Sequence, residues 1–93
     1  MGNPGRAMSL RLFVTGDSPD SAIAIANLRA LFPNGDGAHV EIEIVDVQQQ
    51  PARGARDGII VTPTLLKVSP APPCRVLGNL TNREALRHLL GIQ

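Results

Sequence analysis

The sequence is poor in aromatic residues and in cysteine. Its 93 residues include two phenylalanines, no tryptophan, no tyrosine and a single cysteine, Cys74. The scarcity of aromatic rings removes the stacking surfaces that single-strand nucleic-acid binders use. One cysteine cannot form a disulfide within the chain. These two absences disfavour nucleic-acid binding through stacked bases and a disulfide-stabilised scaffold.

The sequence also lacks charge of one sign and long apolar runs. Nine Lys and Arg residues against eight Asp and Glu residues give a formal net charge of +1, and the two signs are interspersed. No basic stripe is therefore present to neutralise a phosphate backbone, and no apolar stretch has the length needed to span a bilayer. We expect no nucleic acid and no membrane as partner, and we take a cytoplasmic location as the default.

The composition is typical of one small folded domain. Apolar residues make up 43% of the chain and charged residues 18%, a balance that favours a folded chain over a disordered one. A chain of this length forms one domain with a modest core. We expect residues 1–8 to be a flexible N-terminal lead-in and residues 9–93 to form the domain.

The first half of the chain predicts a strand, a helix and a second strand. Residues 9–15 alternate in polarity, which indicates a strand whose even-numbered side chains are buried. Ser18 is a suitable N-cap before Pro19 at the first position of a helix that runs to Leu31. Residues 39–47 alternate again, with one apolar and one charged face. A helix between two strands makes a βαβ unit with parallel strands.

The second half predicts a short helix, a hairpin and a closing helix. We expect the short helix over residues 52–57 and the two strands over residues 64–69 and 75–78, with a proline-rich connection between the strands. The spacing of Thr81 and Glu84 predicts a capping box at the start of the last helix. The buried side of that helix is expected to carry three leucines, Leu86, Leu89 and Leu90. The order βαβαββα defines an α/β domain and matches the thioredoxin-like fold.

Several separated motifs resemble those of the KaiB family. They are LFVTG at residues 12–16, TPTLLKV at residues 62–68 and GNLTNRE at residues 78–84. The motifs agree with the family in both residue identity and spacing. A single short pattern that recurs by chance would not show this agreement. Pro63 stands where thioredoxin-like proteins place a cis-proline before the third strand. The resemblance covers nearly the whole predicted domain.

The resemblance implies a regulatory docking role without catalysis or a cofactor. KaiB-like proteins bind the ring-shaped ATPase KaiC and regulate its cycle, and a related domain is the sensory input of the SasA histidine kinase. The expected partner is therefore a KaiC-like ATPase, with a KaiA-like protein or a histidine-kinase signalling protein as further candidates. A SasA-like sensory domain that stays in the thioredoxin-like state remains an alternative.

The resemblance also implies a change of fold. Members of the family exchange a thioredoxin-like monomer for a tetramer in which the C-terminal half is rearranged, so a dimer or tetramer is compatible with this sequence. Such switching requires two packings within a few kcal/mol of one another. The segment expected to rearrange carries six turn-forming residues, Pro63, Pro70, Pro72, Pro73, Gly78 and Asn79.

Charged side chains are the expected partner-binding residues. They lie on the predicted first helix, the second strand and the short helix: Asp20, Arg29, Glu41, Glu43, Arg53, Arg56 and Asp57. The chain departs from clock-type KaiB proteins at Ile23, Ala26, Glu43 and Gly58, where those proteins tend to carry basic residues. Changed charge at a docking surface alters partner choice more than fold. A role in a stress or signalling pathway is therefore as compatible with this sequence as a role in a clock.

The sequence gives little support for a catalytic function. Residues 17–20 read DSPD where a thioredoxin carries Cys-x-x-Cys, and Cys74 lies far along the chain beside the last predicted strand. His39 and His88 have no neighbouring Cys or His at the spacing of metal ligands. We expect no metal and no enzyme activity, with a residual thiol-redox enzyme as the disfavoured alternative.

Overall fold

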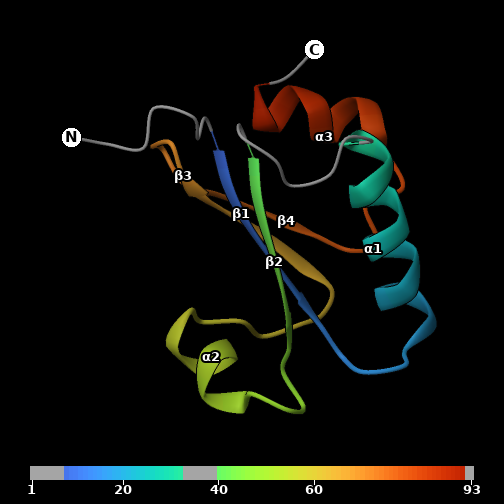
Figure 1. Ribbon diagram of the computed structural model, residues 1–93, viewed down its shortest axis with the longest axis vertical. Helices are drawn as coiled ribbons and strands as arrows, with labels where there is room; N and C mark the ends of the chain where they lie inside the picture. The colour runs from blue at the N-terminus through green and yellow to red at the C-terminus, as the bar shows by residue number, and fades with distance from the viewer. Residues whose placement is uncertain (1–7, 33–39, 92–93) are drawn as a thin grey trace.

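The helices and strands follow one another in the predicted order. The computed structural model describes residues 8–32 and 40–91, and Figure 1 shows a central sheet with helices around it. The elements are β1 (Met8–Val14), α1 (Pro19–Leu31), β2 (Val40–Asp46), α2 (Pro51–Arg56), β3 (Thr64–Ser69), β4 (Cys74–Leu77) and α3 (Arg83–Leu90). The thioredoxin-like βαβαββα order is confirmed.

The four strands form one mixed sheet in the order β2-β1-β3-β4. β1 pairs in parallel with β2, so that Leu12 lies opposite Ile44. This pairing requires a crossover, which α1 supplies. β1 also pairs antiparallel with β3, where Leu12 lies opposite Leu65, and β3 pairs antiparallel with β4. The Thr62–Pro63 peptide bond is cis and immediately precedes β3.

The main core lies between the sheet and the helices α1 and α3. The even-numbered residues of β1 point into it, as the alternation predicted. α1 begins at the Ser18 cap, whose Oγ accepts a hydrogen bond from the Ser21 N–H at 3.1 Å, and its buried apolar residues face the same side of the sheet. The core cluster comprises Met8, Leu10, Leu12, Val14, Ala24, Leu28, Leu31, Leu65, Leu80, Leu86 and Leu90.

A second, smaller buried layer lies on the other face of the sheet, where α2 packs. Phe13 and Val45 are neighbours across β1 and β2 on this face, and both are fully buried. Glu43 and Val45 lie on the same face of β2. The prediction that this face carries only charged side chains is therefore wrong, because Val45 is buried there. The strand buries side chains in both directions because α2 covers one end of the face that the sequence marks as polar.

Two predicted boundaries are wrong. Met8 is the first residue of β1 and only 6% exposed, so the first strand begins one residue earlier than predicted; residues 1–7 lie outside the described part of the chain. The N-cap of α3 is Asn82, whose Oδ1 accepts a hydrogen bond from the Ala85 N–H at 3.0 Å. Thr81 does not cap the helix, because its N–H and hydroxyl both bond to Asn79 Oδ1.

The predicted buried side of α3 is correct for two of its three leucines. Leu86 and Leu90 are buried, whereas Leu89 is 51% exposed. Successive helical residues are rotated by roughly 100°, so Leu89 lies roughly 80° from the centre of the stripe that Leu86 and Leu90 define. A short helix that touches the core along one narrow stripe leaves such a flanking position in solvent.

The turn before α3 is tied to α1. The Asn79 carbonyl accepts a hydrogen bond from Asn27 Nδ2 at 2.9 Å, and Arg83 Nη2 donates to Asn27 Oδ1 at 3.1 Å. Gly78 has φ of +101°, a backbone conformation that side chains with a Cβ rarely adopt. The turn that the sequence predicted at residues 78–80 therefore also fixes how α3 sits against α1.

Candidate docking surface

The β1–α1 turn, where a thioredoxin carries its thiols, holds only structural hydrogen bonds. Ser18 caps α1, and Ser21 Oγ accepts a hydrogen bond from the Thr15 N–H at 3.0 Å. Cys74 is a free, half-buried thiol at the start of β4, and Sγ lies 3.9 Å from the Leu89 carbonyl. β1 and β4 are separated by β3 in the sheet. This arrangement supplies no pair of thiols for redox chemistry.

Residues 8–32 and 40–91 contain neither a metal-binding cluster nor a membrane-spanning helix. No group of three or more His, Cys, Asp or Glu side chains in these ranges could hold a metal ion. His88 is exposed in the last turn of α3, and His39 lies outside the described residues. Within the same ranges, every helix is too short or too polar to cross a membrane.

An ion-pair network joins α2 to the sheet. The pairing registers place Glu43, Arg11, Leu66 and Arg75 in one row across the four strands. Arg11 Nε lies 3.0 Å from Glu43 Oε1, and the same oxygen accepts a hydrogen bond from Arg53 Nη2 at 2.8 Å. Arg11 Nη1 also reaches Asp57 Oδ2 at 2.8 Å, just after α2 ends. The network therefore holds the middle and the C-terminal end of the α2 segment against the row.

The network shifts the titration of two of its members. The hydrogen bond from Arg53 lowers the pKa of Glu43; partial burial opposes that effect, and the hydrogen bond from Arg11 adds to it. Burial alone would lower the pKa of Arg11, but the hydrogen bonds and charges of Asp57 and Glu43 outweigh burial and raise it. Both shifts favour the charged forms.

Glu43→Gln is expected to change the pH dependence of stability. Because the folded-state pKa of Glu43 is lowered, its ionised form stabilises the fold above the unfolded-state pKa of about 4.3, and this contribution is lost as the pH falls through the folded value. The side chain is 44% exposed, so the loss at pH 7 should be at most about 1 kcal/mol. Urea unfolding of both proteins at pH 7 and pH 3 measures it, and a difference that persists unchanged at pH 3 would contradict the ion-pair explanation.

Arg75 fixes the end of the α2 segment from the edge strand β4. Its Nη1 donates to the Gly58 carbonyl at 3.2 Å, and Nη2 donates to the Asp57 carbonyl. These bonds satisfy backbone acceptors and neutralise no charge. Arg56 is exposed in the last turn of α2. Around α2, four arginines (Arg11, Arg53, Arg56 and Arg75) therefore outnumber the three carboxylates of Glu43, Asp46 and Asp57.

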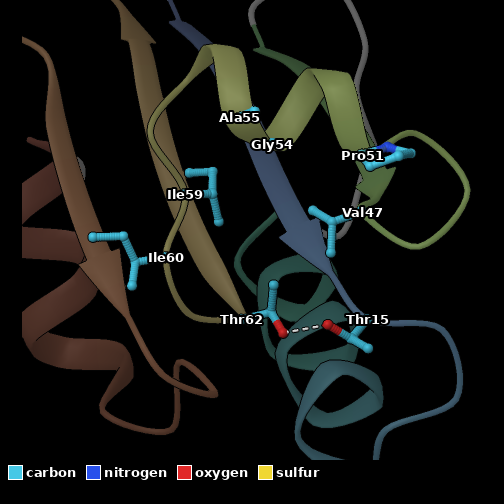
Figure 2. A pocket seen from close by; sticks show the side chains of 8 residues that line it. All are labelled: Thr15, Val47, Pro51, Gly54, Ala55, Ile59, Ile60 and Thr62. Atoms are coloured by element: carbon cyan, nitrogen blue, oxygen red, sulfur yellow. Dashed lines mark hydrogen bonds between the residues drawn. The ribbon is translucent and has the colours of Figure 1, made fainter.

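An apolar pocket opens between α2 and the segment that leads to β3. Its volume is about 350 Å³, and Figure 2 shows Ile59 and Val47 pointing into it beneath α2. The hydroxyls of Thr15 and Thr62 bond to each other at its floor. The lining residues are Thr15, Val47, Pro51, Gly54, Ala55, Ile59, Ile60 and Thr62.

Backbone hydrogen bonds hold the pocket walls in place. The Ile59 N–H donates to the Gly54 carbonyl at 2.9 Å, which folds the chain back along α2, and the Val47 N–H donates to the Val14 carbonyl at 2.9 Å. Gly54 is buried, and a Cβ placed there would lie 3.1 Å from Val47 Cγ1. The missing side chain is what lets α2 approach the end of β2 so closely.

A model of the KaiB domain matches residues 11–92. The chain belongs to the KaiB family. It is 42% identical over 83 residues to the circadian clock protein KaiB3 of Synechocystis sp., which covers 89% of this chain and 79% of that protein. It is 34% identical over 90 residues to the circadian clock oscillator protein KaiB of Synechococcus sp., which covers 97% of this chain and 80% of that protein.

Solved structures show the same fold for this KaiB-family chain. The N-terminal domain of Synechococcus elongatus SasA superposes with a TM-score of 0.71 at 23% identity, over 95% of this chain and 87% of that chain. The thioredoxin of Fasciola hepatica superposes with a TM-score of 0.74 at 22% identity, over 96% of this chain and 82% of that chain. At these identities the similarity establishes a thioredoxin-like fold and no shared activity.

The predicted partner-binding residues of this KaiB-family protein lie in three places: around α2, at the start of β2 and on α1. Glu43, Arg53 and Asp57 come together in the ion-pair network, with Arg56 beside them. Glu41 lies further along β2 and accepts a hydrogen bond from Ser9 Oγ at 3.5 Å. The remaining two, Asp20 and Arg29, lie on α1 across the sheet from α2 (Figure 1). They do not share a surface with the α2 group.

Sequence reasoning missed three contributors to this surface. Arg11 and Arg75 lie on strands, and no local pattern showed that they meet the α2 segment 46 and 17–18 residues away. Ile60 is 94% exposed at the pocket. The run of three β-branched residues at 59–61 was the available signal, since an apolar run outside any predicted strand or helix indicates a surface that binds something.

Proposed function

We propose that this KaiB-family protein is a non-catalytic cytoplasmic module that docks on a KaiC-like ATPase and regulates its phosphorylation or ATPase cycle. The observation that carries the proposal is the KaiB-domain match across residues 11–92. The surface around α2 supports it, because an apolar pocket lies there beside a surplus of arginine side chains. Such a surface suits binding to another protein.

The ion pairs of α2 support a docking role in a second way. Arg11 connects Glu43 and Asp57. Its own side chain is 26% exposed, that of Glu43 is 44% exposed and that of Asp57 is 18% exposed. Partly buried pairs of this kind hold a short helix that has no side-chain cap of its own. A surface that is ordered before binding loses less entropy when the partner docks.

Binding to a purified KaiC-like ATPase tests the proposal. We expect a complex by isothermal titration calorimetry under nucleotide conditions that expose the ATPase docking site, together with a changed rate of ATP hydrolysis by the ring. Cys74→Ser is the matched control, and it should bind as the wild type does because no redox step is involved. Absence of a complex under every nucleotide condition would contradict the proposal.

A SasA-like sensory role is the second candidate. The observation that favours it is the similarity to the SasA N-terminal domain over 95% of this chain, with the C-terminal half in the thioredoxin-like arrangement. Light scattering over a range of protein concentrations separates the two. A monomer at every concentration favours the sensory role, whereas a tetramer favours a module whose docking is gated by refolding.

A further inference from the structure

We propose that the pocket beneath α2 binds one apolar side chain of the partner, and that an acidic residue of the partner lies beside it and faces Arg56. This inference rests on the proposed function, since it names the part of a KaiC-like ATPase that the surface would recognise. The partner is therefore a protein segment with an exposed leucine-, methionine- or phenylalanine-sized side chain next to Asp or Glu.

The lining of the pocket selects an apolar occupant. Six of its eight residues offer only carbon or backbone atoms, and the Thr15 and Thr62 hydroxyls are bonded to each other. The Ile59 N–H of the lining is also satisfied, because it donates to the Gly54 carbonyl at 2.9 Å. The side chains that an occupant meets are therefore mainly hydrocarbon, which favours a hydrocarbon side chain over a charged one.

The pocket opens outward onto apolar side chains. Ala55 is exposed on α2, Ile60 is 94% exposed and Val61 is 50% exposed. Large aliphatic side chains at the mouth of a pocket lose contact with water when a partner covers them. Interfaces draw most of their affinity from such a central apolar anchor surrounded by a polar rim.

The charges beside the pocket indicate the neighbour of the anchor. Arg56 follows Ala55 on α2, is exposed, and has no ion-pair or hydrogen-bond partner in the described part of the chain. The carboxylates of Glu43 and Asp57 are already paired with Arg11 and Arg53. Asp46, which precedes the lining residue Val47, accepts hydrogen bonds from the backbone N–H groups of Gly16 and Gln48. On α2 itself, the charge without a partner is therefore the positive charge of Arg56.

The same surplus argues against a second copy of this chain as occupant. A two-fold dimer places the same patch of both subunits in contact. Here that contact would bring two surfaces together in each of which four arginines outnumber three carboxylates. Like charges across an interface oppose association. A partner with acidic residues around an apolar side chain complements the surface instead.

Ala55→Trp is the most direct test, because the indole would occupy the mouth of the pocket. We expect its affinity for the KaiC-like ATPase to fall at least tenfold. Ala85→Trp is the matched control: Ala85 is exposed on α3, away from the pocket, and binding should stay within twofold of wild type. Ile60→Asp provides a second test that cannot disturb packing, since Ile60 is almost fully exposed, and should also reduce affinity at least tenfold.

These binding measurements distinguish a failure of the anchor pocket from a failure of the docking role. If wild type binds and both pocket variants bind within twofold of it, the anchor pocket is wrong while the docking role stands. If wild type does not bind, both are contradicted. Arg56→Glu tests the acidic neighbour: the association rate should fall several-fold at low salt and the difference should shrink at 0.5 M NaCl. An unchanged rate at low salt would contradict that part.

Discussion

Phe13→Ala is expected to lower the free energy of unfolding by about 3–5 kcal/mol, the range for removing a large buried aromatic side chain. Phe13 is fully buried on the α2 face of the sheet, beside Val45. It does not belong to the main core cluster between the sheet and the helices α1 and α3. The loss therefore measures how much the smaller layer contributes to the fold.

Phe32→Ala is the matched control for that substitution. Phe32 follows α1 and is only partly buried against the main core, so the same chemical change should cost clearly less. Chemical denaturation of both variants, read by circular dichroism, gives the two values. Equal losses, or a larger loss at Phe32, would show that α2 does not cover a buried layer.

Arg11→Met is expected to destabilise the protein by about 1–3 kcal/mol, in the range found for hydrogen bonds to charged groups. The methionine keeps the apolar stem but leaves Glu43 with one arginine and removes the ion pair of Asp57. Asp57 is the more costly loss, since its side chain is 18% exposed while that of Glu43 is 44% exposed. The C-terminal end of α2 should exchange its amide protons faster as well.

The controls for Arg11 lie within the same surface. Arg56→Met removes an exposed arginine without an ion pair and should change the unfolding free energy by less than about 0.5 kcal/mol. The double variant Arg11→Met/Asp57→Asn should lose less than the sum of the single variants, because the two groups contact each other. Strict additivity, or equal losses for Arg11→Met and Arg56→Met, would contradict the role of the network.

The order of helices and strands could be predicted because local signals agree with the tertiary fold. Ser18 followed by Pro19 begins α1 as predicted, and the alternation of β1 correctly assigns Leu10 and Leu12 to the core. The cap of α3 could not be settled in this way. Both Thr81 and Asn82 are suitable caps, and the choice depends on Asn79, which engages Thr81.

The layer beneath α2 could not be predicted from the strand patterns. Alternation shows which residues share a face, but not which helix covers that face. One face of β2 therefore carries both a charged residue, Glu43, and an apolar one, Val45. Only the placement of α2 shows that Val45 is buried and that Glu43 forms ion pairs. Long-range packing decides both outcomes.

Of the residues predicted to bind a partner, those that are near one another along the chain also lie together in the structure. Arg53, Arg56 and Asp57 lie within five residues, and the structure keeps them together with Glu43. Asp20 and Arg29 are also charged and exposed, but α1 carries them to the other face of the sheet. Exposure and charge alone do not show on which surface a residue lies.

The position of Glu43 has a physical explanation in this chain. From the family resemblance, a clock-type member is expected to carry a basic residue here, whereas in this chain the Glu43 carboxylate joins Arg11 and Arg53. A basic residue at this place would face two arginines. The negative charge of Glu43 is therefore matched by its neighbours, and we propose that the cation facing a partner is Arg56.

Amide NMR of the labelled protein, alone and with a KaiC-like ATPase domain, tests the proposed docking surface most directly. We expect the largest shifts and line broadening at residues 47–62 around α2 and its pocket, with the exposed sides of α1 and α3 unchanged. Perturbations confined to α1 and α3 would contradict docking through α2.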